Sequence, residues 1–487
     1  MSLGRIVKGG IWLYGSNLVY VSSGAIYWFI ISIIGGPEIL GVTSAIIGLA
    51  SLVGGLAGLG IRVGVLKFVG AFYGKDDEKV SRYFWSSFIF LIFAYSISAL
   101  TLVLISFFKV KISGLNSEMI LFSALSAFMG FSGIFTAFLT ALLKTKTIFE
   151  ASLLASLAKI LIGVSLVSLG WGWVGAVIGY VSVAIVNMLY LSRVVFKLVG
   201  LKPFFKLAFL HDVIKAGMVS WLPNFINLAG QWLGVLAVFG FSSAFETGLY
   251  YVAFSIANVV FMIAGSLSSV LLPVLSGMED GRKRSTWKAI RVILASAWPL
   301  AVFIIVYPWL PLSLLGSSYI KASPVLKVLI SSLVFMVLTV GVTNLAYAYD
   351  AYMYVLAIGM AANIPRVILY YLLVPFYEGF GAAISFSIGA FTGFLASLYI
   401  ANKINFKIGF KELALTVVFP LLFGVISYIL DLFFIIGGLL IYAGSILAYL
   451  KTRVLLKEDL KEIALSMVPA KYLKKICTLI LKSNRFV

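Results

Sequence analysis

Two basic residues lie near the middle of long apolar segments, where charged side chains are rare. Lys159 lies in the segment 147–170 and Arg366 in the segment 352–374. At the helical rise per residue, Lys159 is roughly 16–18 Å from either segment end and Arg366 roughly 12–20 Å. A charge at such depth costs about 2.5–3.5 kcal/mol on insertion scales and marks a functional site by default. Arg binds phosphate through a planar fork and Lys as a point charge, so the chemistry indicated is anion binding.

The 17 acidic residues all fall in predicted loops, helix ends or the C-terminal tail, so neither cation has an obvious buried carboxylate partner. Two interpretations follow. In one, Lys159 and Arg366 face a central cavity and hold an anionic headgroup such as a lipid diphosphate. In the other, they extend toward the membrane interface or bond to backbone carbonyls between helices. We favour the cavity because an internal repeat makes the two positions equivalent.

Neutral polar residues lie along one face of two further segments. In the segment 10–34, Asn17 and Tyr20 share a face, and the segment 214–238 has an equivalent face just after Pro223, with Asn224, Asn227 and Gln231. These amides and phenols suit sugar hydroxyls, and a proline kink permits bending during gating. The alternative is interhelical hydrogen bonding, worth about 0.6 kcal/mol on average.

Arg62 ends the segment 41–61 on the side predicted to be cytoplasmic. It either meets a diphosphate at the inward mouth of the cavity or anchors the helix by the positive-inside rule.

Composition requires that these residues be carried by membrane helices. The 487-residue chain is 62% hydrophobic and 11% charged, against roughly 25% charged residues in soluble domains. Apolar stretches of about 20 residues recur, and each must satisfy its own backbone within lipid. We therefore predict an all-α integral membrane protein of about fourteen transmembrane helices, at 10–34, 41–61, 83–107, 117–143, 147–170, 173–196, 214–238, 246–270, 288–310, 324–347, 352–374, 380–402, 412–430 and 432–450.

The placement of the net charge of +20 indicates membrane topology rather than a nucleic-acid surface. With both termini in the cytoplasm, the outer connections hold few basic residues, namely Lys109, Lys111, Lys321 and Lys327. The cytoplasmic loops and tail hold nearly all the others, as the positive-inside rule requires. The tail 451–487 carries Leu473, Ile476 and Ile480 on one face among lysines, which predicts an interfacial amphipathic helix. We expect a multi-pass protein of the cytoplasmic membrane.

A shift of 207 residues aligns the first half of the chain with the second. Asn17 falls on Asn224, and Gly41 falls on Gly248. The same shift places Lys159 on Arg366. Each is followed, after twelve residues, by a Gly-rich stretch that begins at Gly172 in the first half and at Gly379 in the second. The predicted domains are a six-helix lobe over 1–200, a second over 201–410, two further helices over 411–450 and the basic tail over 451–487. Parallel repeats with a site between them are typical of alternating-access transporters.

The sequence offers little for catalysis. Its lone Cys477 and lone His211 build neither a disulfide nor a histidine metal site. We recognise no nucleophile elbow, metal cluster or phosphate-binding glycine loop in a suitable context. We expect no enzymatic activity, no cofactor and no direct use of ATP.

Several loose motifs are spread along the predicted helices, namely Gly58-Leu-Gly-Ile-Arg62 through Phe72-Tyr-Gly-Lys-Asp-Asp-Glu-Lys79, Gly248-Leu-Tyr-Tyr-Val-Ala253, Ser266-Leu-Ser-Ser-Val-Leu-Leu-Pro-Val-Leu275 and Val374-Pro-Phe-Tyr-Glu-Gly-Phe-Gly-Ala-Ala383. Their order and spacing resemble those of the multidrug/oligosaccharidyl-lipid/polysaccharide exporter superfamily, in particular its polysaccharide flippase branch. The resemblance implies fourteen helices in a V-shaped pair of six-helix lobes. It also implies transfer of isoprenoid-linked oligosaccharides to the outer leaflet.

The function expected is a flippase for a lipid-linked oligosaccharide, either a polyprenyl phosphate or a diphosphate. Its partners would be this substrate, membrane lipids and glycan-assembly enzymes, with the protein itself a monomer. A cation-coupled multidrug antiporter of the same superfamily is the alternative, although no Asp or Glu lies in mid-helix. An oligosaccharide polymerase or ligase is disfavoured because the longest outer connection, 311–323, has no His, Arg or carboxylate.

Overall fold

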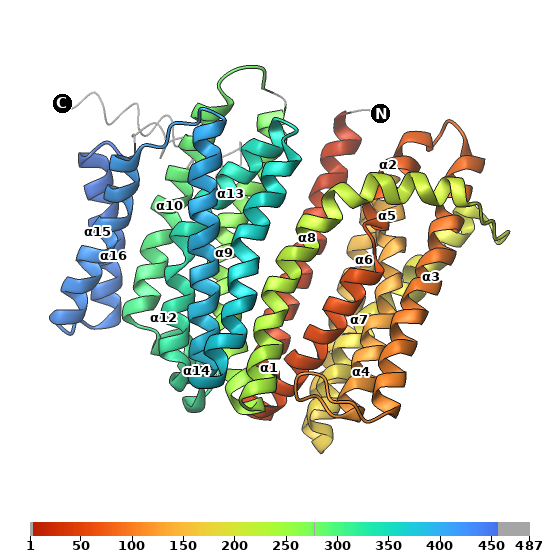
Figure 1. Cartoon of the computed structure of the whole chain (residues 1–487), viewed down its shortest axis with the longest axis horizontal. Coiled ribbons are helices and arrows are strands. Elements are labelled where there is room, and N and C mark those ends of the chain that lie inside the picture. Colours follow the sequence, from red (N-terminus) through yellow and green to blue (C-terminus); the bar gives the residue numbers. More distant parts are fainter. Residues whose placement is uncertain (1–2, 277, 456–487) are drawn as a thin grey trace, which may run out of the picture. The chain divides into compact units, whose positions relative to one another are not determined.

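The computed structural model describes residues 3–276 and 278–455, and its named elements are all helices (Figure 1). The long ones are α1 (Leu3–Ala57), α3 (Asp77–Phe107), α6 (Thr145–Leu166), α7 (Gly172–Val199), α8 (Leu207–Phe241), α9 (Ala244–Ser276), α10 (Arg282–Val306), α13 (Leu333–Ala348), α14 (Tyr352–Lys403), α15 (Phe410–Ile429) and α16 (Phe434–Lys451). The short ones are α2 (Ile61–Phe72), α4 (Ser117–Phe128), η1 (Met129–Ser132), α5 (Gly133–Ala141), η2 (Val167–Trp171), α11 (Trp309–Ser313), η3 (Ser317–Ala322) and α12 (Ser323–Ser331). The amphipathic helix predicted in the tail falls on residues from 456 onward, which lie outside the described residues.

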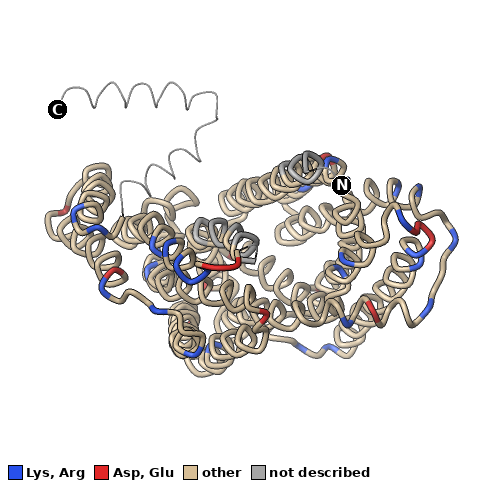
Figure 2. The backbone as a smooth tube through the Cα atoms, turned by 90° about the horizontal axis from the view of Figure 1, so that it is seen from above, with Lys and Arg blue, Asp and Glu red and all other residues tan. Residues whose placement is uncertain are grey.

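The described part of the chain contains 11 helical segments long and apolar enough to cross a membrane, which confirms an all-helical membrane protein. Most of its backbone carries neither Lys, Arg, Asp nor Glu (Figure 2). Three of these segments have 46, 55 and 52 residues, about twice the 20 that one crossing needs. The number of crossings stays a prediction.

Each of the three long segments is interrupted at a point where the sequence predicts a helix boundary. Gly36 has φ 70° and precedes Pro37 in α1. Gly170 has φ 89° just before α7 begins. In α14 the break is at Glu378, a non-glycine residue with φ 50°. Positive φ ends the α-helical hydrogen-bond ladder, so each segment consists of two straight parts.

The loop expected after residue 61 is partly helical instead. In α2 the residues Ile61, Gly64, Val65 and Val69 are buried at helical spacing. The prediction was wrong here because the exposed basic residues Arg62 and Lys67 suggested a loop. The helix that follows, α3, is capped by Asp76, whose carboxylate accepts a hydrogen bond from the Lys79 amide at 3.0 Å. This bond lowers the pKa of Asp76.

The described chain forms two compact units. The first comprises residues 3–257, 309–329 and 352–396, and the second comprises the described residues within 258–308, 330–351 and 397–455. Each unit combines separate parts of the sequence. This division does not test the predicted lobes at 1–200 and 201–410, which stay a prediction.

Within the first unit, α1 and α9 cross with their backbones in contact, and the contact obeys the internal repeat. A Cβ atom at Gly41 would lie 1.8 Å from the Ala244 carbonyl oxygen, and one at Gly248 would lie 1.9 Å from the Pro37 carbonyl oxygen. The shift of 207 relates Gly41 to Gly248 and Pro37 to Ala244, so one contact is repeated with the two halves exchanged. Small residues allow membrane helices to approach this closely.

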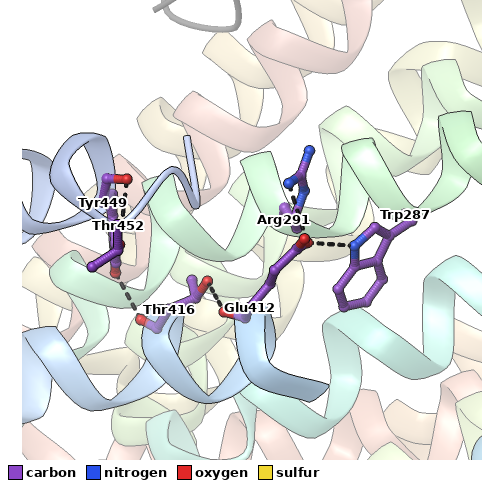
Figure 3. A network of polar contacts seen from close by, with 6 residues as sticks. All are labelled: Trp287, Arg291, Glu412, Thr416, Tyr449 and Thr452. Carbon is purple, nitrogen blue, oxygen red and sulfur yellow. Dashed lines mark hydrogen bonds and ion pairs between the residues drawn. The ribbon is translucent and has the colours of Figure 1, made fainter. Parts of the chain in front are cut away.

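Within the second unit, one polar network joins α10, α15 and α16 (Figure 3). The Glu412 carboxylate in the first turn of α15 accepts hydrogen bonds from Trp287 Nε1 at 2.7 Å and Arg291 NH1 at 3.1 Å. Thr416 donates to the Glu412 carbonyl at 2.7 Å, and the buried Tyr449 of α16 donates to the Thr416 carbonyl at 2.7 Å. A charged group thus anchors the start of α15 to α10.

We predict that Gly41→Ala and Gly248→Ala each destabilise the protein by about 1–3 kcal/mol, because the added methyl group overlaps a carbonyl oxygen. Gly10→Ala in α1 is the matched control, since no atom lies within 4 Å of its Cβ position. Thermal unfolding in detergent measures the difference. Equal stability of the three variants would contradict the backbone contact.

We predict that Glu412→Gln lowers stability by about 1 kcal/mol, because it removes the charge from partly exposed hydrogen bonds to α10. The control is Glu118→Gln, which also removes a first-turn acid but has no side-chain partner among the described residues. Unfolding followed by tryptophan fluorescence reports the effect. The network has no such role if both variants unfold at the same temperature.

Candidate functional site

The structure buries Lys159 on α6 among neutral groups of α1. Its side chain is 6% exposed, and Nζ donates to Ser23 Oγ at 3.4 Å and lies 5.5 Å from the centre of the Tyr27 ring. Ser23 Oγ also donates to Ser156 Oγ at 2.9 Å. The ammonium group therefore has a hydroxyl acceptor and an aromatic face, but neither carries a full negative charge.

Arg366 on α14 has a corresponding environment next to α8. It is 7% exposed, its NH1 donates to Asn363 Oδ1 at 2.9 Å, and its guanidinium lies 4.1 Å from the centre of the Phe386 ring. Asn363 Nδ2 in turn donates to Asn227 Oδ1 at 3.1 Å and to the Gly359 carbonyl at 2.9 Å. The Nε atom of Arg366 is buried without a hydrogen-bond partner in the described part of the chain.

No Asp or Glu among the described residues forms an ion pair with Lys159 or Arg366. The described salt bridges join helix ends and connections, such as Lys146 with Glu150 at 3.5 Å. Both deep cations consequently keep an uncompensated charge within the described part of the protein, and this leaves them electrostatically suited to an anion.

The internal repeat extends to the packing beside each cation, with the roles of two helices exchanged. In the first half Tyr27 of α1 fills the space over Gly163 of α6, where a Cβ atom would lie 2.5 Å from the tyrosine hydroxyl. In the second half, the residue that the shift of 207 relates to Gly163 is Tyr370 of α14. Tyr370 fills the space over Gly234 of α8, where a Cβ atom would lie 2.8 Å from the tyrosine hydroxyl. Gly234 itself corresponds to Tyr27. One large side chain per half thus packs beside its cation.

A cavity of about 540 Å³ brings together two of the residues selected from the sequence, Arg62 and Asn224. It lies along the second part of α1, and its other polar lining residues are Ser51, Tyr95, Ser126, Tyr180, Ser220 and Trp221. Two of these side chains bond to glycines of α1 that also line the cavity. Tyr95 donates to the Gly54 carbonyl at 3.0 Å, and Trp221 Nε1 donates to the Gly55 carbonyl at 2.8 Å. The volume falls in the range of small-molecule sites, roughly 300–1,000 Å³.

At one end of this cavity α8 meets the connection between α1 and α2, again through glycines. A Cβ atom at Gly217 would lie 2.2 Å from the Gly60 carbonyl oxygen, and one at Gly60 would lie 2.5 Å from the Gly217 carbonyl oxygen. This is the end that the charge distribution predicts to be cytoplasmic.

Of the remaining selected residues, Asn227 joins the network of Arg366 through Asn363, and the others are dispersed. Lys159 and Arg366 do not line the cavity of Arg62. Tyr20 accepts a hydrogen bond from Asn187 Nδ2 at 2.7 Å, Asn17 is exposed on α1, and Gln231 is partly buried on α8. Pro223 is buried, and α8 continues through it without a non-helical residue. Whether these residues bind substrate or control gating stays a prediction.

The sequence analysis missed the neutral residues that hold the cations, Ser23, Ser156 and Asn363. A usable signal was present, because Ser156 and Asn363 each precede their cation by three residues and are related by the same shift of 207. Residues three apart on a helix are neighbours, so each lies beside its cation.

The comparisons with known proteins agree with this architecture. The family described as "Polysaccharide biosynthesis protein" matches residues 45–324. No curated protein matches the sequence.

Solved structures of transporters are similar in fold. A lipid II flippase, MurJ, in an inward closed conformation is 16% identical, with a TM-score of 0.73 over 93% of this chain and 99% of that chain. A multidrug resistance MATE family transporter in an inward-facing conformation is 16% identical, with a TM-score of 0.61 over 80% of this chain and 94% of that one. A MOP superfamily transporter from Pyrococcus furiosus is 15% identical, with a TM-score of 0.56 over 82% and 95%.

The matched family covers more than half of the chain, and the fold is similar to that of the solved transporters. The chain belongs to the family described as "Polysaccharide biosynthesis protein".

Proposed function

We propose that this transporter moves a lipid-linked oligosaccharide, carried on a polyprenyl phosphate or diphosphate, from the cytoplasmic to the outer leaflet by alternating access. The observation that supports this most is the pair of repeat-related cations, Lys159 and Arg366, each buried without a carboxylate partner among the described residues. Family membership supports a role in polysaccharide biosynthesis. Both termini lie in the cytoplasm in this proposal, and the protein acts as a monomer beside glycan-assembly enzymes.

Electrostatics favours an anionic substrate. A deeply placed cation is costly in the bilayer, and an anion that reaches it recovers part of this cost. Arg366 keeps a buried Nε donor without a partner in the described chain, so one side of its guanidinium fork is available to a phosphate oxygen. Within the described chain, the Lys159 ammonium has one hydrogen bond to exchange, the 3.4 Å contact with Ser23 Oγ beside the Tyr27 ring.

The route has two stages, because Arg62 lines a cavity whereas Lys159 and Arg366 are almost fully buried. The phosphate group first meets Arg62, and the sugar hydroxyls meet Asn224. Rearrangement of the helices then exposes the deep cations, with Asn17, Tyr20, Asn227 and Gln231 contacting sugars and Pro223 allowing α8 to bend. The glycine contact between Gly60 and Gly217 separates when the predicted cytoplasmic end opens.

A cation-coupled multidrug antiporter is the competing function, and a MATE transporter shares the fold. Residue types weigh against it, because the deep charged positions described here are basic. Cationic drugs and coupling cations are repelled by uncompensated positive charge.

We predict that Lys159→Ala and Arg366→Ala each lower the rate of lipid-linked glycan flipping by about tenfold or more, since a charge-assisted hydrogen bond contributes about 1.5–3 kcal/mol. Lys159→Arg and Arg366→Lys keep the charge and retain more of the activity. Flipping is measured in proteoliposomes by protection of the glycan from an external glycosidase.

Lys111→Ala is the matched control, because it removes a charge from an exposed connection. Size-exclusion chromatography and thermal unfolding show whether each variant is folded. A folded double variant, Lys159→Ala with Arg366→Ala, that flips at the normal rate overturns the anionic-substrate proposal.

A further inference from the structure

A second cavity lies between α2 and α5, and Asn224 is not among its lining residues. It has a volume of about 330 Å³ and is lined by Arg62, Val63, Leu66, Gly133, Thr136, Ala137 and Thr140. We call it the α2–α5 groove. Nothing in the two-stage route described above uses it.

The groove adjoins the larger cavity. Arg62 and Val63 line both spaces, so they form the wall that the two share. If the phosphate of a molecule lies at Arg62 in the larger cavity, the group bonded to that phosphate can therefore reach the groove.

The guanidinium of Arg62 is held in this wall by two glycines of the neighbouring segment. Its NH2 donates to the Gly130 carbonyl at 2.6 Å. A Cβ atom at Gly133 would lie 2.2 Å from the guanidinium carbon, so the group rests directly on the Gly133 backbone. Arg62 is nevertheless exposed, and no carboxylate among the described residues pairs with it.

Beyond Arg62 the groove is lined mainly by apolar side chains, and two of them are exposed. Val63 is 44% exposed and Leu66 is 42% exposed. The Thr140 hydroxyl donates to the Thr136 carbonyl at 2.7 Å, so its proton is used within α5. A cation at one end and hydrocarbon side chains along the rest match a phosphate followed by a hydrocarbon chain.

We infer that the α2–α5 groove holds the first part of the substrate's polyprenyl chain while its phosphate lies at Arg62, an inference that rests on the proposed function. Lipid tails are as apolar as the groove, so moving a chain from the bilayer into it gains little hydrophobic energy. The groove acts instead by orientation, because it aligns the phosphate with the cavity before the helices rearrange. Its occupant is the chain of the substrate rather than an acyl chain of bulk phospholipid.

Photocrosslinking tests the occupant without requiring transport. A benzophenone amino acid replaces Leu66 in the groove or, as the matched control, Leu153, which is 40% exposed on α6. The full-length protein is placed in vesicles of phosphatidylethanolamine and phosphatidylglycerol that contain a radiolabelled polyprenyl diphosphate without sugar.

We expect position 66 to capture the polyprenyl diphosphate at least fivefold more than position 153, and Arg62→Gln to remove most of this excess. Equal capture at the two positions overturns the inference. So does capture of phosphatidylglycerol at position 66 that the polyprenyl diphosphate does not displace.

A groove-filling variant separates this inference from the proposed function. Ala137→Phe should lower the flipping of the lipid-linked glycan by about tenfold while leaving the affinity for a water-soluble glycan diphosphate, which has no chain, unchanged. If Ala137→Phe flips normally, the groove has no role. If the wild-type protein flips no lipid-linked glycan, the proposed function fails, whereas the crosslinking result still decides whether the groove binds the chain.

Discussion

A positive charge buried in a helix bundle within the membrane must be balanced by a neighbouring group or by a ligand. Lys159 and Arg366 meet hydroxyl, amide and aromatic groups, but no carboxylate in the described part of the chain. Neutral acceptors and ring faces reduce the cost of burial without cancelling the charge. The rest of the proposed mechanism depends on this incomplete compensation, because it gives an anionic substrate a free-energy gain at the two equivalent positions.

Glycine contacts determine how the helices around these cations are arranged. The crossing of Gly41 with Ala244, and of Gly248 with Pro37, repeats one contact with the halves exchanged. Such backbone contacts have few side-chain conformations to reorganise, so helices can separate there and meet again in the same register. The contact of Gly60 with Gly217 at one end of the cavity has the same character.

Much of the fold could be predicted from the sequence because membrane helices have a strong apolar signal and their ends carry Gly and Pro. The breaks at Gly36 and Gly170 lie at predicted helix boundaries. The helix α2 could not be predicted, because its exposed basic face looks like a loop. The cations were found from their depth alone, whereas Ser23 and Asn363 are ordinary polar residues that only the three-dimensional contacts select. Hydropathy likewise gives no indication of which residues line the Arg62 cavity.

The central claim is that the transporter recognises negative charge on its substrate. The most direct measurement compares the affinity of the purified protein for one lipid-linked oligosaccharide in two forms, one with the diphosphate and one with an uncharged ether linkage of the same length. We expect the uncharged form to bind at least tenfold more weakly, and Lys159→Ala with Arg366→Ala to remove most of this difference. Equal affinity for the two forms would contradict it.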